Sequence, residues 1–220
     1  LPRYLATADS RAARRTRQRA ATRCRESGCR SSPIESGRRS ASGTARLITA
    51  NGKTYRLKIE HSFNQRQYVD WLYRELKSLA SAEPKIKLQT INGTEYKKYW
   101  FNTHYSGSFR FYAQQFYQGK KKIVPKLISH WLTPLALAIW FMDDGSIKSK
   151  ECQEKILNTH SFDAVSLELL QRALDKNFRI RTSLRKQKEG FQIYILAGEA
   201  VKLRQTIGKY VLPSMQYKLG

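Results

Sequence analysis

Two stretches of the chain share one order of hydrophobic and polar positions. Each begins with a short strand-like run, residues 55–60 or 155–159, and the tripeptide His-Ser-Phe follows at residues 61–63 and again at 160–162. In both copies an amphipathic segment comes next, with apolar residues at helical spacing. These residues are Val69, Leu72, Leu76, Leu79 and Ala80, then Val165, Leu169, Leu170, Ala173 and Leu174. The 99-residue spacing of the tripeptide predicts an internal repeat.

Each copy continues with a predicted hairpin and a second helix. Asn92-Gly93 is typical of a type I′ turn, and Glu189-Gly190 takes the corresponding place in the second copy. Alternating segments adjoin the turns, and closing helices are expected after them. The alternating segments are 96–103 and 180–187, and the closing helices are 108–117 and 198–210. Each copy therefore has the order strand, helix, hairpin, helix.

The second copy is preceded by an apolar segment, residues 133–142, that ends at Asp143-Asp144-Gly145. Thr133 suits the N-cap of a helix and Pro134 suits its first position. Two carboxylates at a helix C-terminus lie at the negative end of the helix dipole, which is unfavourable unless a cation binds there. Because carboxylate oxygens are ligands that Mg²⁺ prefers, Asp143 and Asp144 are candidate magnesium ligands.

The charge of the chain indicates the class of its binding partner. The chain has 41 Lys and Arg against 17 Asp and Glu, a net charge of +24. Such an excess favours a polyanionic partner, with nucleic acid ahead of an anionic membrane surface. No run of 18 apolar residues occurs, so the pattern predicts no membrane span. The three Cys, with no CxxC pair, argue against a disulfide framework and a structural zinc site.

Residues 1–50 differ from the rest of the chain. They hold 12 Arg and no Lys, and they show no sustained apolar periodicity. A segment of this composition buries too little apolar area to offset its ordering entropy. Three interpretations remain open, namely an organellar transit peptide, a basic arm that contacts phosphates, and an out-of-frame translation.

Residues 137–145, Leu-Ala-Ile-Trp-Phe-Met-Asp-Asp-Gly, resemble the LAGLIDADG motif of homing endonucleases. Leu-Thr-Pro at 132–134 and Val-Leu-Pro-Ser-Met-Gln-Tyr-Lys-Leu at 211–219 resemble the intron-encoded branch of that family. The resemblance implies an α+β fold of two pseudo-symmetric αββαββα halves in one monomeric chain. We place the halves at 51–125 and 126–220, after the leader at 1–50, with the first motif helix missing or unrecognisable.

The same resemblance implies roles for particular residues. Asp144 corresponds to the Asp that binds a divalent metal and takes part in catalysis, with Asp143 as the alternative metal ligand. Lys218 resembles the basic active-site residue of the second half, and Lys122 resembles that of the first. Sequence alone does not separate Lys122 from the adjacent lysines at 120 and 121. The reaction implied is Mg²⁺-dependent hydrolysis of both strands of a long duplex DNA target.

The predicted strands carry the candidate DNA contacts. Polar side chains alternate with apolar ones, so that each sheet has a basic, acid-poor face suited to a DNA groove. The candidate DNA-binding residues are Arg56, Lys58, Arg181, Ser183, Arg185, Gln187, Gln192 and Tyr194.

The first copy departs from the family pattern. The 99-residue spacing predicts a carboxylate near position 45, where the sequence has Thr44-Ala45-Arg46 and no apolar helix before it. We therefore expect this chain to bind double-stranded DNA but to nick it at most. The alternatives are a maturase that binds intron RNA and a catalytically degenerate remnant. The family suggests an organelle or a bacterial cytoplasm rather than secretion.

Overall fold

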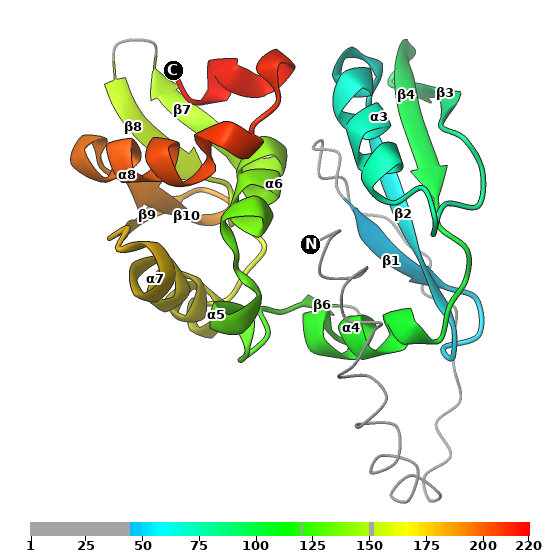
Figure 1. Ribbon diagram of the computed structural model, residues 1–220, viewed down its shortest axis with the longest axis horizontal. Helices are drawn as coiled ribbons and strands as arrows, with labels where there is room; N and C mark the ends of the chain where they lie inside the picture. The colour runs from blue at the N-terminus through cyan, green and yellow to red at the C-terminus, as the bar shows by residue number, and fades with distance from the viewer. Residues whose placement is uncertain (1–44, 120, 150–151) are drawn as a thin grey trace, which may run out of the picture. The chain divides into compact units, whose positions relative to one another are not determined.

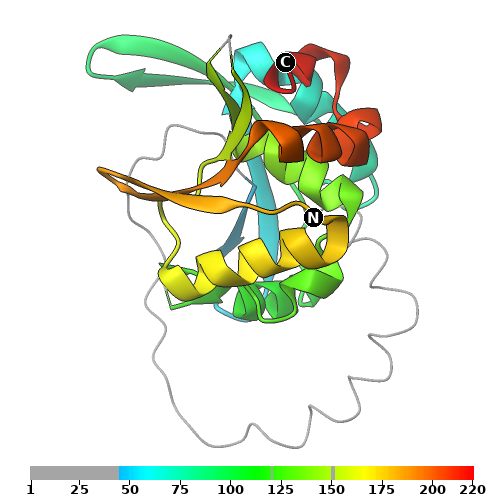
Figure 2. The ribbon, with the colours of Figure 1, turned by 90° about the vertical axis from the view of Figure 1, so that its left-hand side faces the viewer.

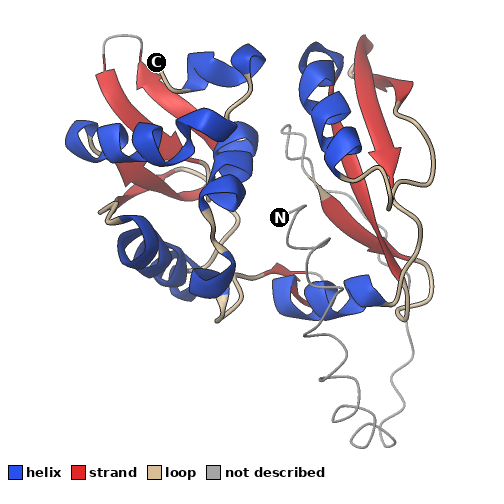
Figure 3. Ribbon diagram, in the orientation of Figure 1, coloured by secondary structure: helices blue, strands red, loops and turns tan. Residues whose placement is uncertain are grey.

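A computed structural model describes residues 45–119, 121–149 and 152–220, and these residues form two compact units. The first unit ends at Phe111 and the second begins at Tyr112. This division falls before the predicted boundary at residue 125. In each unit a four-stranded antiparallel sheet carries helices on one face (Figure 3). None of the helices within the described ranges has the length and hydropathy needed to cross a bilayer.

The first unit is built on a sheet with the strand order β1-β2-β4-β3 (Figure 1). Helix α3 packs against β2 and β4 through its apolar face, and α4 leads into the second unit. The elements are β1 (Arg46–Thr49), β2 (Tyr55–Ser62), a 3-10 turn (Phe63–Gln65), α3 (Arg66–Glu75), β3 (Lys85–Ile91), β4 (Thr94–Asn102) and α4 (Ser108–Phe116).

The second unit repeats this topology, with the strand order β7-β8-β10-β9. The helix that precedes β7, the first strand of this four-stranded sheet, is α6, which is apolar on all sides. The elements are β5 (Tyr117–Gln118), β6 (Lys121–Lys122), α5 (Ile128–Trp131), α6 (Pro134–Asp144), β7 (Gly145–Ser149), β8 (Cys152–Leu157), α7 (Ala164–Phe178), β9 (Ser183–Gln187), β10 (Gly190–Ile195), α8 (Ala197–Ile207) and two 3-10 turns (Gly208–Tyr210, Pro213–Lys218).

The burial pattern shows that equivalent positions lie 98 residues apart from β2 to α3, so the predicted spacing of 99 was wrong by one. The buried residues of α3 have buried counterparts at this spacing in α7. The pairs are Tyr68 with Ser166, Val69 with Leu167, Leu72 with Leu170, and Leu76, just after α3, with Leu174. Repeated burial identifies equivalent positions because both helices must present the same face to their sheets.

The His-Ser-Phe triplets consequently mark the same region without occupying the same positions. His61 is buried in β2, where its Nδ1 lies 3.1 Å from Oε1 of Gln65. At the equivalent place in the second unit, Thr159 is buried, and His160 is the next residue. The hydroxyl of Thr159 donates to the carbonyl of Phe191 at 2.9 Å, which joins the exit of β8 to β10.

The two long helices, α3 and α7, begin with different N-cap residues. Asp163 is the N-cap of α7, since its side chain accepts a hydrogen bond from the Ser166 backbone at 2.9 Å. Asn64 does not cap α3, because the N-cap is Gln65, which makes no side-chain cap bond. Gln65 corresponds to Asp163 at the 98-residue spacing.

Strand pairing also places the counterpart of Asp144. Leu47 pairs with Leu57 in the first sheet, and Ile147 pairs with Lys155 in the second. Since Leu57 and Lys155 are equivalent, Ala45 corresponds to Gly145, and the residue before it corresponds to Asp144. That residue is at position 44, which lies outside the described residues, as do the positions where the family's first motif helix would precede it. Residues 46–49 of the range predicted as a leader form the strand β1.

Candidate functional site at the end of helix α6

Helix α6 begins and ends as its sequence predicts. Thr133 is the N-cap, with its hydroxyl accepting a hydrogen bond from the Ala136 backbone at 3.2 Å, and Pro134 occupies the first turn. At the other end a Cβ on Gly145 would lie 2.4 Å from the carbonyl oxygen of Phe141. Only glycine therefore allows the chain to leave the helix directly into β7, which fixes the two aspartates at the junction.

The last carbonyl groups of α6 receive hydrogen bonds from outside the helix. The ammonium group of Lys218 donates to the carbonyl of Met142 at 2.5 Å and lies 3.4 Å from that of Asp143. The backbone and the side-chain amide of Asn158 both donate to the carbonyl of Asp144, at 3.0 and 2.9 Å. Because the final carbonyls of a helix have no partners within it, these donors stabilise the segment that carries both acids.

The carboxyl group of Asp144 is half-buried at this junction. Burial raises its pKa above the ordinary value, while the positive charges of Lys122 and Lys218 act to lower it. Within residues 45–119, 121–149 and 152–220, its carboxylate oxygens accept no hydrogen bond. The carboxyl group of Asp144 is thus partly shielded from water, and the positive charges of Lys122 and Lys218 compensate its negative charge.

The neighbouring lysines have separate roles in the structure. Lys121 pairs with Asp163 at 2.9 Å, whereas Lys122 of β6 is the lysine whose charge acts on Asp144. Residue 120 lies outside the described part of the chain. Burial lowers the pKa of Lys218, and the carboxylates of Asp143 and Asp144 oppose that shift. The fold therefore distinguishes Lys122 from its neighbour, a choice that sequence left open.

The donor set at this junction fits a hard divalent cation. In the described ranges, no group of three or more His, Cys, Asp or Glu side chains comes together. Mg²⁺ does not require such a cage, since it commonly binds through one or two carboxylates together with water and substrate phosphates. Asp144, with carboxylate oxygens that accept no hydrogen bond, is the residue best suited to such binding, and Asp143 is beside it.

The candidate DNA-binding residues of β9 and β10 share the face of the second sheet that points away from the helices. Gln192 is paired with Arg185, and Tyr194 is paired with Ser183. Every residue of β9, including Gln187, is exposed. Tyr194 itself is only 4% exposed, and its ring centroid lies 4.4 Å from the guanidinium of Arg185. It therefore supports a cation on this face rather than presenting its own surface.

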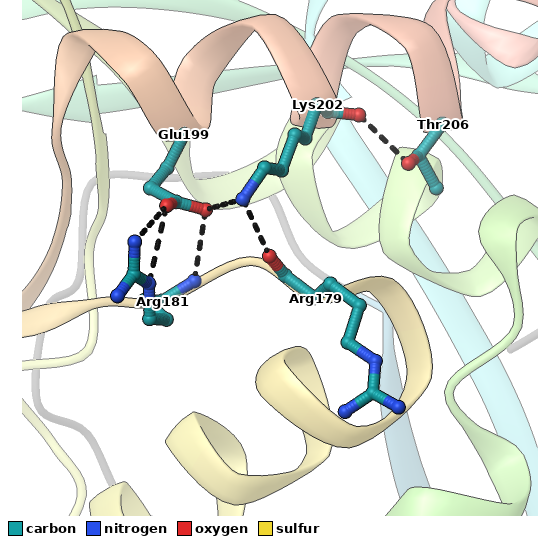
Figure 4. Close-up of polar contacts among 5 residues, drawn as sticks. All are labelled: Arg179, Arg181, Glu199, Lys202 and Thr206. Atoms are coloured by element: carbon teal, nitrogen blue, oxygen red, sulfur yellow. Dashed lines mark hydrogen bonds and ion pairs between the residues drawn. The ribbon is translucent and has the colours of Figure 1, made fainter.

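Arg181 differs from this group, as Figure 4 shows. It precedes β9, and its backbone and guanidinium donate to Glu199 of α8 at 3.1 and 3.4 Å. Lys202 donates to the same carboxylate at 2.9 Å, and this hydrogen bond is the main cause of the lowered pKa of Glu199. The Lys202 ammonium also bonds the carbonyl of Arg179, so the cluster joins α8 to the end of α7.

In the first sheet, Arg56 and Lys58 lie half-buried on the outward face of β2. The guanidinium of Arg56 lies 4.9 Å from the ring of Tyr105, and Lys58 forms an ion pair with Glu60 at 2.6 Å. Pairing adds further residues that sequence reasoning did not select. They are Arg46, Lys85, Lys87, Gln89, Lys98 and Trp100. The alternation of residues 85–89 was the signal that could have identified the three on β3.

The face of the first sheet is therefore more basic than that of the second. Among its described positions Glu60 is the one acid, and it is neutralised by Lys58. The β3–β4 hairpin that carries much of this charge extends as a long ribbon beyond α3 (Figure 2).

Comparison with known proteins decides the family. The model of the LAGLIDADG DNA endonuclease family matches residues 42–203, about three quarters of the chain. The chain belongs to the LAGLIDADG DNA endonuclease family. The resemblance found in residues 137–145 is thereby confirmed, and so is the α+β fold expected from it.

The relatives of this chain include proteins named as maturases and a protein named as a DNA endonuclease. Cytochrome b mRNA maturase bI2 of Debaryomyces hansenii is 32% identical over 175 residues, which are 77% of this chain and 66% of that protein. The protein of the same name from Saccharomyces cerevisiae is 29% identical, and the match covers 42% of its length. DNA endonuclease I-ChuI of Chlamydomonas applanata is 29% identical over 81% of this chain and 89% of its own. The chain thus spans less than two thirds of either maturase.

A solved LAGLIDADG structure has the same fold. The homing endonuclease I-WcaI bound to its DNA recognition sequence aligns with a TM-score of 0.75 at 22% identity, over 81% of both chains. At this identity the likeness shows a shared fold.

Proposed function

We propose that this chain is a site-specific endonuclease of double-stranded DNA. The observation that carries the proposal is the half-buried carboxylate of Asp144, which accepts no hydrogen bond within the described residues and is compensated by Lys122 and Lys218. Family membership and the basic sheet faces support the same conclusion, because both point to a DNA polyanion as substrate.

The residues at the junction have complementary roles in this proposal. Asp144 would hold the metal, and Asp143, the preceding residue, would be the alternative ligand. Lys218 keeps the end of α6 in place through two carbonyls, and its charge lies where negative charge develops on a phosphate. The charge of Lys122 in β6 acts on the same carboxylate, and its ammonium group would polarise an attacking water. When bound, Mg²⁺ supplies Lewis-acid polarisation of the phosphate and an activated water.

The sheet faces would select the target. Arg185 and Gln192 are paired across β9 and β10 with side chains on the outward face, and these residue types read guanine and adenine edges in a major groove. The lysines of the β3–β4 hairpin suit phosphate contacts, which add affinity without sequence preference. Because one chain carries both sheets, we expect it to act as a monomer.

We expect this polypeptide to nick its target rather than to cut both strands. Asp144 supplies one carboxylate at one junction, whereas position 44 of the first repeat holds Thr44. Hydrolysis of two strands needs a metal-binding acid at each scissile phosphate, so one acid supports one cut.

The test begins by selecting cleaved sites from supercoiled plasmids that carry a randomised insert, in Mg²⁺ or in EDTA. We expect Mg²⁺-dependent open circles at one sequence and none with Asp144→Asn. Linear product as the first species would refute the single-acid expectation. If neither Mg²⁺ nor Mn²⁺ supports any strand cleavage at a bound site, the endonuclease proposal itself fails.

A maturase that binds intron RNA is a second candidate, favoured by the names of two relatives. A basic sheet face also suits RNA, and a maturase needs no second acid. Filter binding of the host intron RNA in competition with target duplex DNA separates the two. A preference for duplex supports the endonuclease, whereas a preference for the intron, together with faster splicing in vitro, would replace it.

A further inference from the structure

Asn158 joins the outward face of the second sheet to the helix end that carries Asp144. It follows β8 directly, and its backbone and Nδ2 both donate to the carbonyl of Asp144. Its remaining side-chain atom, Oδ1, accepts a hydrogen bond from Nε2 of Gln192 at 2.7 Å. The side chain of Asn158 therefore connects Gln192, on the outward face of the sheet, to the backbone of Asp144, the candidate metal ligand.

This connection is sensitive to what Gln192 binds. A glutamine reads adenine through two hydrogen bonds, one donated by Nε2 and one accepted by Oε1. Such a contact competes for the amide that now bonds Asn158. Because the two Asn158 donors share one carbonyl oxygen, a rotation of the Asn158 side chain changes the hydrogen bonding at Asp144.

The first unit does not repeat the connection. At the 98-residue spacing Asn158 corresponds to Glu60, whose carboxylate pairs with Lys58 on the same strand. Lys58 in turn corresponds to Ile156 of the second unit. The link is therefore present in the repeat that holds the acid, where a coupling between recognition and cleavage could act.

We propose that Asn158 is a positioning residue that couples base recognition by Gln192 to the placement of Asp144. The inference rests on the proposed endonuclease function, and it makes Asn158 neither a metal ligand nor a group that touches the reacting atoms. It predicts that Asn158 affects the rate of strand cleavage and has little effect on DNA affinity.

The kinetic test compares Asn158→Ala, Gln192→Ala and the double variant on the selected target. We expect Asn158→Ala to lower the single-turnover rate about tenfold, as loss of a residue that orients a ligand commonly does, with the Kd for DNA within about twofold. Gln192→Ala should lower both rate and affinity. The double variant should cleave no more slowly than Gln192→Ala alone, because both changes break one connection.

Asn177→Ala is the matched structural control. Its side-chain amide also donates to two backbone carbonyls, those of Ser129 and Leu132, at 2.7 and 2.9 Å, but neither belongs to the site. It should lower Tm while leaving the single-turnover rate near that of the wild type. A purely structural Asn158 would behave in the same way, and its effects would add to those of Gln192→Ala.

A second readout does not require cleavage. In the free protein, Gln192→Ala should shift the backbone amide NMR signals of Asp144 and Gly145, and this response should vanish in the Asn158→Ala background. An equal response in both backgrounds would overturn the proposal. If the NMR coupling is present but no metal supports cleavage, the endonuclease function fails while the structural link stands, so the two failures are distinguishable.

Discussion

The two sheets have the same strand order, but they are elaborated in different ways. In the first unit Ile59 and its cross-strand partner Phe101 are 42 positions apart in sequence, whereas the equivalent Leu157 and its partner Ile193 in the second unit are 36 apart. The first unit uses the longer segment for a long basic hairpin, and the second has the shorter hairpin and a complete junction at the end of α6. Under the proposed function, the first repeat would contribute mainly phosphate contacts and the second would contribute the metal-binding acid.

Burial is retained between the long helices of the two repeats where polar identity is not. Each buried residue of α3 has a buried counterpart in α7, yet Gln65 corresponds to Asp163 and Glu60 to Asn158. The core constrains volume at each buried site, because interiors are close-packed. Polar residues at the junction have no such constraint, so the two repeats could diverge in function within one fold.

The largest effect is expected from removing the acid at the end of α6 in the second unit. Asp144→Asn should reduce Mg²⁺-dependent cleavage by at least about 100-fold, because the carboxylate charge that holds the metal is lost. DNA affinity should stay within a few-fold in gel-shift titrations. Asp163→Asn, an acid outside the site that stays a good cap, is the control and should cleave normally. Equal loss in both variants would place the chemistry elsewhere.

Gly145→Ala tests whether the close junction is particular to the second unit. The added methyl meets the Phe141 carbonyl, so we expect unfolding free energy to fall by about 2 kcal/mol, as for overpacked sites. Gly198→Ala in α8 meets no atom within 4 Å and should be neutral or stabilising. Urea melts of both variants provide the measurement, and similar losses would contradict the geometry.

The lysine pair of β6 can be separated in function. Lys122→Met should slow cleavage about tenfold, as expected for a group that assists proton transfer or charge stabilisation, while Lys121→Met should leave the rate unchanged. Lys121→Met should instead lower stability slightly, since it removes the exposed pair with Asp163. Single-turnover rates and Tm values of the two variants give a direct contrast.

The caps of the equivalent helices predict different responses to acid. The Lys121 hydrogen bond and the Ser166 backbone lower the pKa of Asp163 to about 2. Because this is below the unfolded value, the contribution is complete above pH about 4 and is lost as pH falls toward 2. Asp163→Ala should therefore lower Tm by several degrees at neutral pH and converge with wild type in acid. Asn64→Ala should change Tm little at any pH.

The smallest effect concerns the basic hairpin of the first unit. Lys87→Ala should weaken DNA binding a few-fold and reduce the slope of log K against log salt by about 1, independently of sequence. Lys77, an exposed lysine just after α3, is the control and should leave the slope unchanged. A loss of sequence selectivity with Lys87→Ala would show that it reads bases rather than phosphates.

Local patterns determined much of this protein. The N-cap of α6, the Asn92-Gly93 turn with positive φ at both residues, and the acid pair at the helix end all depend on neighbouring residues, and the structure has them as predicted. The resemblance of residues 137–145 identified the family, and it did so because those residues must pack and turn within one short segment.

Contacts between residues far apart in the chain became known from the folded structure. The His-Ser-Phe tripeptide recurs after 99 residues, whereas structurally equivalent positions from β2 to α3 recur after 98. The two differ because strand faces are set by burial and cross-strand pairing rather than by residue identity. Strand pairing added the basic residues of β3 and β4, hydrogen bonds joined Arg181 to Glu199 of α8, and the charge of Lys122 in β6 was found to act on Asp144. These outcomes depend on contacts between segments far apart in the chain, whose balance of burial and charge no local pattern contains.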